Sequence, residues 1–511
     1  MQIAHRAQGV SLRKLLPDSR FLGDRDIRIH SCSGNPRGVR PGDLFVALQT
    51  GDFDGHDQVG EALQRGAAAV LAERMLSIDA PLCVVPDSRE AFGQICQELA
   101  GQPARRLRTV GVTGTNGKTT TSLLIASVLR AGSQATGVLT GMFYDDTEDQ
   151  VTATRTTPQA PELADWLSRM AAHDCRNAVL EVSSRALAEK RTAGVAFDVA
   201  VVTNVRREHL DYHGSLQNYR RMKTRLLQQL KPQGFAVINA DDPASRQWLK
   251  HLDCPVLTFG LHSSAEVMAS VVERFAGEQT ILLTAGHETA AVQTRMFGDH
   301  HVYNCLAAAA VGLGSGLDLP TIARGLEALQ QIPGRLEPVV CGQPFGVYVD
   351  YGRSPDALAV SLRALRQVTT GRVICLYGAD AARDPAERPL LGRVVERNAQ
   401  LGIIANNNPR HEEPLQIAHD ILDGYERPAR AHILPDRAEA IRWALGEART
   451  GDAVLISGKG DQQSQVIGGE EQFFDDREVA QEWLRGVGAQ IDYDQPPARI
   501  LSFPRGAELL N

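Results

Sequence analysis

The sequence RTVGVTGTNGKTTTSLLIASVLRAG, residues 108 to 132, decides the fold of this chain. An apolar run is followed by a glycine-rich loop and then by an apolar helical pattern that Gly132 ends. In such an order, the loop N–H groups and the helix N-terminus face phosphate oxygens, a lysine adds a point charge and a threonine hydroxyl can bind Mg²⁺. The residues predicted to hold the phosphates of ATP or GTP are Gly114, Thr115, Asn116, Gly117, Lys118, Thr119 and Thr120.

The phosphate-loop pattern is not complete. Val112 stands where the pattern G-x-x-x-x-G-K-[ST] has its first glycine. An ordinary glycine-rich turn between a strand and a helix is the alternative. Because the apolar strand before the loop and the helix after it are both intact, we favour nucleotide binding.

Short apolar runs alternate with helical patterns through most of the chain, and they end in Gly, Thr, Asn, Ser or Asp. Apolar runs between helices are typical of buried parallel strands, so we expect an α/β protein. Ligands of such sheets collect at the carboxyl ends of the strands. Six further runs share the pattern: residues 178 to 184, 198 to 205, 234 to 242, 372 to 378, 401 to 407 and 452 to 458.

The composition excludes several classes of protein. With 511 residues, of which 43% are hydrophobic and 23% charged, the chain is expected to form about three globular domains. A net charge of −7, an aromatic share of 5% and the lack of a basic block argue against nucleic acid or an anionic membrane as partner. The eight cysteines form no C-x-x-C pair, and no apolar stretch approaches the ~18 residues of a membrane helix. We expect a soluble cytoplasmic protein with reduced cysteines and a small-molecule partner.

Lys223 occupies an unusual place in the helix expected over residues 215 to 230. Ser215 is a suitable N-cap, and apolar residues recur at helical spacing. At about 100° per residue, Lys223 falls inside the apolar stripe. Either its ammonium reaches water at the rim of the stripe, or the lysine is desolvated, has a lowered pKa and acts as a neutral amine. The sequence leaves both alternatives open.

Two candidate metal ligands precede this helix. Glu181 ends one apolar run, and His209 follows the next. Both are therefore expected at the same edge of the sheet as the phosphate loop. Carboxylate oxygen and imidazole nitrogen suit Mg²⁺ or Mn²⁺ held against a nucleotide.

The order of motifs along the chain resembles the Mur ligases, and within them the MurE type, which adds the third residue of the peptidoglycan stem peptide. The motifs are PGDLFVAL at 41 to 48, DGH at 54 to 56, GTNGKTTT at 114 to 121, TTP at 156 to 158, EVSS at 181 to 184, HLDYHG at 209 to 214, PGR at 333 to 335, VDY at 349 to 351, NPR at 408 to 410, DRAEAI at 436 to 441 and GKG at 458 to 460. They span nearly the whole chain, and so many ordered motifs are far more specific than one alone.

The resemblance implies three domains. These are a smaller N-terminal α/β domain at residues 1 to 107 that binds the UDP substrate, a central ATP-binding domain with a P-loop-type parallel sheet at 108 to 333, and a C-terminal Rossmann-like domain at 334 to 511 that binds the amino acid. The last is expected to end in an extended tail from about residue 490. Residues 264 to 297 are expected to form a few irregular strands in a small antiparallel insertion.

The resemblance also implies an ATP-dependent amide ligation. The carboxylate of UDP-MurNAc-L-Ala-D-Glu would attack the γ-phosphate of ATP, which gives an acyl phosphate and ADP. The amine of a free amino acid would then attack the acyl phosphate and release phosphate. This reaction serves peptidoglycan synthesis and therefore cell wall biogenesis, cell shape and cell division. A cytoplasmic monomer is expected.

Family roles carry over position by position. The implied catalytic residues are Lys118, Glu181, His209 and Lys223, and the implied magnesium ligands are Thr119, Glu181, His209 and Lys223 as a CO₂-derived carbamate. Beside the phosphate loop, the implied ATP contacts are Asn304, Arg335 and Asp350. The implied contacts to the UDP substrate are Arg37, Thr156, Thr157, Ser183 and Arg191. The implied contacts to the amino acid are Arg383, Asn407, Asn408, Arg410, Gly458 and Gln462.

Several site positions depart from the family's motifs. Arg185 replaces the His that ends the family's EVSSH motif, and Glu208 replaces the Asp of its D-H motif before His209. The family's D-Y-A-H motif reads Asp350-Tyr351-Gly352-Arg353 in this chain. The first Asn of the family's N-x-x-N motif is His301 here, and the D-S-R of its uridine site reads Asn35-Pro36-Arg37. D-N-P-R reads Asn407-Asn408-Pro409-Arg410, and G-K-G-H-E ends in Asp461-Gln462. In relatives that add diaminopimelate, the replaced Asp and Glu favour a distal ammonium. Their loss predicts weaker binding of that group, and hence an unusual third amino acid or a divergent paralogue.

Two other interpretations stay open. One is a ligase of the same fold with a different acceptor, as in polyglutamate or cyanophycin-type ligases. The other is a nucleotide-binding paralogue whose catalysis is impaired. The survival of the complete catalytic set favours the MurE-like ligase.

Overall fold

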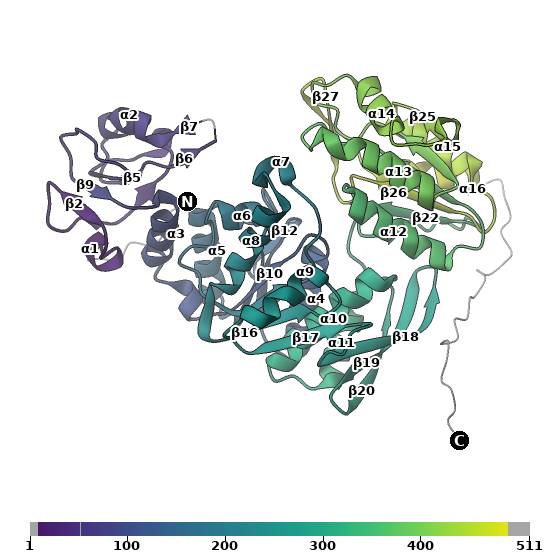
Figure 1. Ribbon diagram of the computed structural model, residues 1–511, viewed down its shortest axis with the longest axis horizontal. Coiled ribbons are helices and arrows are strands. Elements are labelled where there is room, and N and C mark those ends of the chain that lie inside the picture. The colour runs from purple at the N-terminus through teal and green to yellow at the C-terminus, as the bar shows by residue number, and fades with distance from the viewer. Residues whose placement is uncertain (1–8, 52, 489–511) are drawn as a thin grey trace.

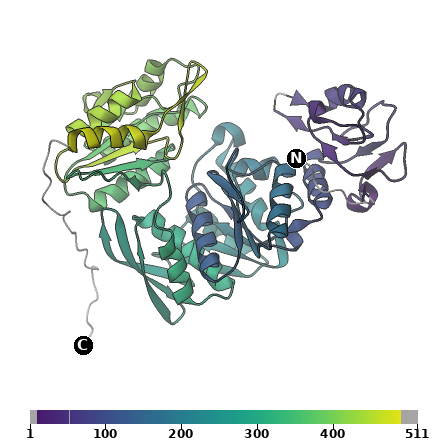
Figure 2. The same ribbon diagram turned by 180° about the vertical axis from the view of Figure 1, so that it is seen from behind.

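A computed structural model describes residues 9 to 51 and 53 to 488, which form three α/β lobes that follow one another along the chain (Figure 1). The central lobe lies between the other two in views from both sides (Figure 2). The principal sheets of the lobes have five, eleven and six strands in chain order. None of the helices in the two described ranges is long and apolar enough to cross a membrane.

The N-terminal lobe contains the sheet of order β2-β9-β8-β5-β4, in which β2 pairs antiparallel with β9 and the other pairs are parallel. Its elements are β1 (Val10–Ser11), α1 (Leu12–Leu15), β2 (Arg20–Leu22), β3 (Arg28–Ile29), β4 (Cys32–Ser33), β5 (Leu44–Val46), β6 (Gln49–Thr50), β7 (Phe53–Asp54), α2 (Val59–Gln64), β8 (Ala69–Ala72), β9 (Leu82–Val84) and α3 (Ser88–Leu99).

Helix α3 joins this lobe to the central one. Ala160 and Ala164 of the central lobe belong to the same buried apolar cluster as the inner face of α3. A Cβ on Gly93 of α3 would lie 2.7 Å from the Cβ of Ala193, so glycine permits the close approach. The N-terminal lobe is therefore packed against the central lobe through a helix rather than through an extended sheet.

The central lobe contains the sheet of order β13-β12-β11-β14-β10-β15-β16-β17-β18-β19-β20. The seven strands from β11 to β18 in this order are parallel, and the two at either end pair antiparallel. The strands are β10 (Arg108–Thr113), β11 (Thr136–Leu139), β12 (Phe143–Asp145), β13 (Gln150–Thr152), β14 (Asn177–Glu181), β15 (Phe197–Val202), β16 (Leu230–Asn239), β17 (Val256–Gly260), β18 (Val267–Phe275), β19 (Glu278–Ala285) and β20 (Glu288–Thr294).

Helices cover both faces of this sheet, which explains why its middle strands are almost entirely apolar. The helices are α4 (Lys118–Ala131), α5 (Ala160–Ala172), α6 (Ser184–Ala188), α7 (Leu210–His213), α8 (Leu216–Leu227), α9 (Pro243–Trp248), α10 (Asp299–Gly314) and α11 (Leu319–Ala328). Helices α4, α10 and α11 share one buried cluster, and α5 and α8 share another. Val112 of β10 is in register with Glu181 of β14 and Val201 of β15, so the three carboxyl ends meet at one edge.

Residues 264 to 297 agree in part with the expectation of a few irregular strands in a small antiparallel insertion. They form the strands β18 to β20, which pair antiparallel with one another and have a register shift between Val271 and Glu273, but Phe259 of β17 pairs in parallel with Val267 of β18. The segment therefore extends the main sheet. Buried side chains alternate with more exposed ones along much of β18 and β19, and polar residues interrupt both strands, so the sequence shows no continuous apolar run there.

The C-terminal lobe contains the sheet of order β21-β22-β26-β23-β24-β25, parallel except for β21. Its strands are β21 (Glu337–Pro338), β22 (Gly346–Asp350), β23 (Val373–Tyr377), β24 (Leu401–Ile404), β25 (Ala431–Ile433), β26 (Ala453–Ser457), β27 (Ser464–Ile467) and β28 (Glu470–Phe473). Its helices are α12 (Pro355–Val368), α13 (Arg388–Asn398), α14 (Pro414–Leu422), α15 (Arg437–Glu447) and α16 (Asp476–Gly488).

The predicted α/β class with three parallel-sheet units is confirmed, and all seven apolar runs form strands. The boundaries at 107/108 and 333/334 stay a proposal, which is supported because each principal sheet lies within one of the three stretches. The tail expected from about residue 490 lies outside the described residues.

Candidate active site

A cavity of about 980 Å³ lies between the central and C-terminal lobes. Most of the predicted site residues line it: Thr115, Asn116, Gly117, Lys118, Thr119, Thr120, Thr156, Glu181, Ser183, His209, Asn304, Arg335, Asp350, Arg383 and Arg410. The other predicted residues are not among those that line it: Arg37, Gly114, Thr157, Arg191, Lys223, Asn407, Asn408, Gly458 and Gln462. The cavity thus brings together predicted site residues that are as far apart in the sequence as Thr115 and Arg410.

The phosphate loop turns between β10 and α4 with the geometry that an anion site needs. Gly117 has φ +81°, and a Cβ there would lie 2.3 Å from Oδ1 of Asn304, so only glycine fits. Lys118 begins α4, and its Nζ donates to the carbonyl oxygen of Thr115 at 2.8 Å. The N-terminus of a 14-residue helix therefore faces the cavity with a lysine beside it.

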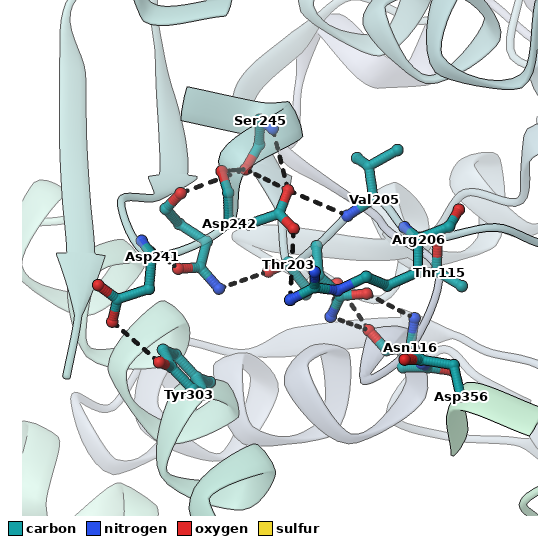
Figure 3. A network of polar contacts seen from close by, with 12 residues as sticks. Thr115, Asn116, Thr203, Val205, Arg206, Asp241, Asp242, Ser245, Tyr303 and Asp356 are labelled. Atoms are coloured by element: carbon teal, nitrogen blue, oxygen red, sulfur yellow. Dashed lines mark hydrogen bonds and ion pairs between the residues drawn. The ribbon is translucent and has the colours of Figure 1, made fainter. Parts of the chain in front are cut away.

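Hydrogen bonds to the loop that follows β15 hold the phosphate loop in place (Figure 3). Thr203 Oγ1 donates to the carbonyl of Asn116 at 2.7 Å, and the Asn116 N–H donates to Oδ1 of Asn204 at 3.0 Å. On the opposite side, Asn116 Nδ2 donates to Oδ2 of Asp356 at 2.7 Å. Because Asp356 lies in α12, this last bond connects the phosphate loop with the C-terminal lobe.

Glu181 ends β14 directly beside the phosphate loop. Its Oε2 accepts from Thr119 Oγ1 at 2.8 Å and from the Gly141 N–H at 3.0 Å, and the residue is 3% exposed. Arg335 Nη2 lies 3.4 Å from the same Thr119 hydroxyl. A carboxylate, a hydroxyl and a guanidinium from three segments therefore converge at the start of α4.

Lys223 lies inside the protein, so the desolvated alternative describes it. The residue is 1% exposed, and its Nζ donates to the carbonyl oxygen of Gly114 at 2.7 Å. Burial, together with the charge of Lys118, holds the pKa of Lys223 well below its usual value. The Lys223 amine therefore lies directly beside the phosphate loop, and its surroundings favour the neutral, unprotonated amine.

His209 and Glu208 lie at the same edge. Half of the His209 side chain is exposed, yet the loss of water around it in the cavity lowers its pKa. Glu208 loses water as well, but Lys118, His209 and Arg383 outweigh that effect and lower its pKa. Arg383 Nη2 lies 3.6 Å from Glu208 Oε1, which makes a second link between the two lobes.

The residues predicted for the UDP substrate have different surroundings. Thr156 and Ser183 line the cavity, while Thr157 is buried and donates to the Glu181 carbonyl at 2.8 Å. Arg191 is 6% exposed; its Nε and Nη2 donate to Glu189, and its Nη1 donates to the Thr157 carbonyl. Arg37 is exposed in the N-terminal lobe.

The residues predicted for the amino acid are organised by an aspartate that the sequence reasoning missed. Asp380 follows β23 and is 4% exposed. Its Oδ1 accepts from Arg410 Nε at 3.1 Å and from the Ala382 N–H at 2.9 Å, and its Oδ2 accepts from Asn408 Nδ2 at 3.0 Å. Burial opposes its ionisation, but these donors outweigh burial and lower its pKa. Asp380 therefore fixes the guanidinium of Arg410 at the cavity wall.

The amide side chains near Asp380 are used within the protein. Asn408 Oδ1 accepts from Lys459 Nζ at 3.2 Å and from the Val466 N–H at 3.1 Å, so its amide is fully bonded. Asn407 Nδ2 donates to the Gly458 carbonyl at 3.2 Å. Oδ1 of Asn407 and Oε1 of Gln462 are buried without a hydrogen-bond partner. On this wall the cavity is lined instead by Asp380, Ala382, Arg383, Arg410 and Asp461.

Six acidic residues that line the cavity were not predicted as site residues: Glu208, Asp241, Asp299, Asp356, Asp380 and Asp461. Asp380 carried a usable signal, because it directly follows an apolar strand at the edge where ligands collect. Asp241 also follows a strand end, and its Oδ2 accepts from the Tyr303 hydroxyl at 2.9 Å (Figure 3). No group of three or more His, Cys, Asp and Glu side chains suited to a metal occurs within residues 9 to 51 and 53 to 488.

Three parts of the chain match models of protein families. Residues 28 to 100 match the Mur ligase family catalytic domain, residues 112 to 312 the Mur ligase middle domain, and residues 334 to 460 the Mur ligase glutamate ligase domain. These matches leave little of the described chain unassigned.

Similar proteins match along most of their length. A UDP-N-acetylmuramoyl-L-alanyl-D-glutamate–2,6-diaminopimelate ligase of Geobacillus kaustophilus (strain HTA426) is 42% identical over 461 residues, 88% of this chain and 94% of the relative. A UDP-N-acetylmuramyl-tripeptide synthetase of Roseiflexus sp. (strain RS-1) is 39% identical over 456 residues, 84% of this chain and 90% of the relative. The solved structure of another 2,6-diaminopimelate-adding ligase of this name has a TM-score of 0.67 at 29% identity, and covers 94% of this chain and 100% of its own.

Proposed function

The chain belongs to the Mur ligase family, and we propose that it is an ATP-dependent ligase that adds the third amino acid to UDP-MurNAc-L-Ala-D-Glu. The observation that carries this proposal is the shared cavity. The phosphate loop with Lys118 forms one side of it, and two arginines, Arg383 and Arg410, form the other. A carboxylate activated by ATP and the amine of an amino acid can meet in such a space.

The chain's own residues hold the charges of the first step. The substrate carboxylate attacks the γ-phosphorus of ATP, a P–O bond to ADP breaks, and an acyl phosphate forms. Both reactants are anions, so nearby cations must offset their repulsion. Lys118 and Arg335 suit this role, because both lie at the start of α4 where the helix dipole is also positive.

The second step joins the amino acid. Its neutral amine attacks the acyl carbon, the nitrogen loses a proton, and the C–O bond to phosphate breaks. Arg410 suits the α-carboxylate or another carboxylate of the amino acid, because Asp380 engages only its Nε and leaves the Nη pair available. Among the inter-lobe contacts, those of Asn116 with Asp356 and of Glu208 with Arg383 support closure of the cavity around both substrates.

The residues at the phosphate loop fit Mg²⁺. Thr119 and Glu181 offer a hydroxyl and a carboxylate 2.8 Å apart, and His209 offers an imidazole whose lowered pKa favours the neutral, ligating form. When bound, Mg²⁺ neutralises charge on the phosphates. Glu181 is the one acidic ligand in this set, so a carbamate on Lys223 would supply a second negative charge.

Carbamylation of Lys223 has support in its surroundings. A carbamate forms when an unprotonated amine attacks CO₂ and loses a proton, and burial favours the unprotonated amine here. A Lys223→Ala variant should lose activity and regain part of it with added formate or acetate. A Lys118→Ala variant is the matched control, because no short carboxylate can replace a cation. Rescue of neither variant, or of both, contradicts the carbamate.

The proposed place of action is the cytoplasm, where the protein would work as a monomer in peptidoglycan synthesis and so serve cell wall biogenesis, cell shape and cell division. Support comes from the eight cysteines, all of which are free thiols. Sedimentation at the concentration used for assays tests the monomer.

One assay tests the proposed reaction against its alternatives. Phosphate release is measured with ATP, Mg²⁺, UDP-MurNAc-L-Ala-D-Glu and a panel of amino acids that includes meso-diaminopimelate and lysine. Amine-dependent release with the UDP substrate supports the proposal. Release only with another carboxylate acceptor supports a ligase with a changed substrate, and no release with any acceptor supports a nucleotide-binding paralogue.

A further inference from the structure

Arg353 lies in a short, firmly held loop between β22 and α12. Asp350 at the end of β22 accepts hydrogen bonds from the Gly352 N–H at 3.1 Å and from Ser361 Oγ at 2.7 Å. Ser354 caps α12 by accepting from the Ala357 N–H at 3.3 Å. Both ends of the loop are therefore tied to regular structure, and the loop places Arg353 on the cavity wall.

The guanidinium of Arg353 stacks on an aromatic ring that Arg335 also contacts. The guanidinium carbon of Arg353 lies 3.9 Å from the centre of the Tyr351 ring, and that of Arg335 lies 4.2 Å from the same centre. The two arginines are thus at most about 8 Å apart, as these two distances require. Gly460 packs against the backbone of Tyr351, where a Cβ would lie 2.7 Å from the Tyr351 Cβ, so glycine permits this close approach.

The charge of Arg353 is not compensated by the protein. No ion pair of Arg353 occurs in the described part of the chain, and its Nε is buried without a hydrogen-bond partner. Arg383 and Arg410 on the same cavity are paired with carboxylates. A buried donor without a partner is unfavourable, so this side chain is best satisfied by an anion that enters the cavity.

The position of Arg353 identifies that anion. Arg335 lies 3.4 Å from the Thr119 hydroxyl of the phosphate loop, so the Tyr351 ring stands beside the start of α4. The backbone of Tyr351 also lies against Gly460, where a Cβ would be 2.7 Å from the Tyr351 Cβ, and Gly460 is in the loop that carries Gly458 and the cavity-lining Asp461. Arg353 therefore lies between the phosphate loop and the loops that carry the predicted amino-acid contacts.

We infer that Arg353 is a further catalytic residue, which binds the phosphoryl group as it passes from ATP to the substrate carboxylate. This inference rests on the proposed function. The P–O bond to ADP breaks and the bond to the carboxylate oxygen forms while Arg353 donates to the phosphoryl oxygens. When the amine then attacks the acyl carbon and the C–O bond breaks, the guanidinium stays with the departing phosphate and keeps its own protons, because it remains charged.

The test compares Arg353→Met, Arg353→Lys and the control Arg366→Met, which removes an exposed arginine of α12 outside the cavity. Arg353→Met should lower kcat by about 100-fold or more, while the KM for ATP should rise by no more than about tenfold. Arg353→Lys should recover part of that loss, because a point charge remains. Arg366→Met should match the unmodified protein. A Met variant whose kcat stays within about threefold of the unmodified protein overturns the inference.

A binding measurement separates this inference from the proposed function. Calorimetry with Mg²⁺ compares ADP with the non-hydrolysable ATP analogue AMPPNP. Arg353→Met and Arg353→Lys should bind ADP with an affinity within about twofold of that of the unmodified protein. This result would also show that both variants fold. The Met variant should bind AMPPNP at least about fivefold more weakly than the unmodified protein does. If the unmodified protein releases no phosphate but this selective loss occurs, the proposed ligase fails while the phosphoryl contact stands. Equal losses for both nucleotides, or none, overturn the contact.

Discussion

The two walls of the cavity hold their positive charges in different ways. We call Lys118, Arg335 and Arg353 the nucleotide wall, and Asp380, Arg383 and Arg410 the amino-acid wall. On the nucleotide wall, Lys118 donates to a backbone carbonyl, and within the described residues none of the three cations has an ion pair. On the amino-acid wall, Arg410 is paired with Asp380, and Arg383 with Glu208 and Glu387.

This difference fits the charges of the two ligands. A wall of unpaired cations gains most from a ligand of net negative charge, such as ATP or an acyl phosphate. A wall of paired charges suits a ligand that carries both signs, as an amino acid does. Asn407 and Gln462 stand where the family's motifs have Asp and Glu, and so lack two negative charges. Part of this charge is present nearby at Asp380 and Asp461, both of which line the cavity.

The largest expected effect is loss of the lysine on the nucleotide wall. Lys118→Met should lower phosphate release by about 10³-fold or more, since Lys118 is the cation that belongs to the phosphate loop itself, and Arg335 reaches the start of α4 only through the Thr119 hydroxyl at 3.4 Å. Steady-state phosphate release measures this effect. Lys250→Met, at an exposed position in the central lobe, is the control and should leave the rate unchanged. A Lys118→Met rate within tenfold of the unmodified rate would mean that the loop does not hold the reacting phosphate.

The shape of the phosphate loop gives the next largest effect. Gly117→Ala should lower the free energy of unfolding by about 1 to 3 kcal/mol and weaken ADP binding, because φ +81° is unfavourable for alanine and its Cβ meets Asn304. Gly316→Ala is a matched control, since Gly316 has φ +82° but open space around a Cβ. It should lower stability by about 1 kcal/mol with unchanged ADP affinity.

Denaturant unfolding and calorimetry measure the two glycine variants. Similar ADP affinity for both would show that the contact with Asn304 does not matter, and that backbone strain alone explains the loss of stability in Gly117→Ala.

A smaller effect is expected on the amino-acid wall. Asp380→Asn keeps the size of the side chain but removes the charge that holds Arg410 through its Nε, so the KM for the amino acid should rise about tenfold. The kcat and the KM for ATP should change little. Asp384→Asn is the control, because Asp384 lies in the same loop, does not line the cavity, and asparagine keeps its bond to the Ala386 N–H. An equal rise in the KM for ATP would assign Asp380 a general structural role instead.

The smallest effect is expected from the loss of Glu387, one of the two carboxylates that pair with Arg383. In Glu387→Gln, Arg383 still has Glu208 at 3.6 Å, so the KM for the amino acid should change by less than about threefold. Steady-state kinetics at low and moderate salt measure it. A larger change than in Asp380→Asn would reverse the order of importance that we assign to the two arginines.

The sequence predicted the phosphate loop on the nucleotide wall, with Lys118, because local pattern encodes it. A strand, a glycine-rich loop and a helix follow one another within residues 108 to 132, and Lys118 and Gly117 need no distant partner to be recognised. The same is true of the seven apolar runs, all of which form strands.

The amino-acid wall could not be predicted in the same way, because its pairs are not local. Asp380 and Arg410 are 30 positions apart, and Glu208 and Arg383 belong to different lobes. The family resemblance identified Arg191 as a substrate contact, yet Glu189 and Thr157 use its Nε and both Nη groups. Which arginines are available to a ligand is a property of the packed structure.

The most direct test of the account is the stoichiometry of the product. The protein is incubated with ATP, Mg²⁺, UDP-MurNAc-L-Ala-D-Glu and the amino acid that the panel selects, and mass spectrometry follows the UDP compound while ADP and phosphate are quantified. We predict one new amide for each ADP and each phosphate, with a mass gain of one amino acid less water, and none of these products with Lys118→Met. ATP consumption without amide formation, or an unchanged UDP compound with every amino acid, would contradict the account.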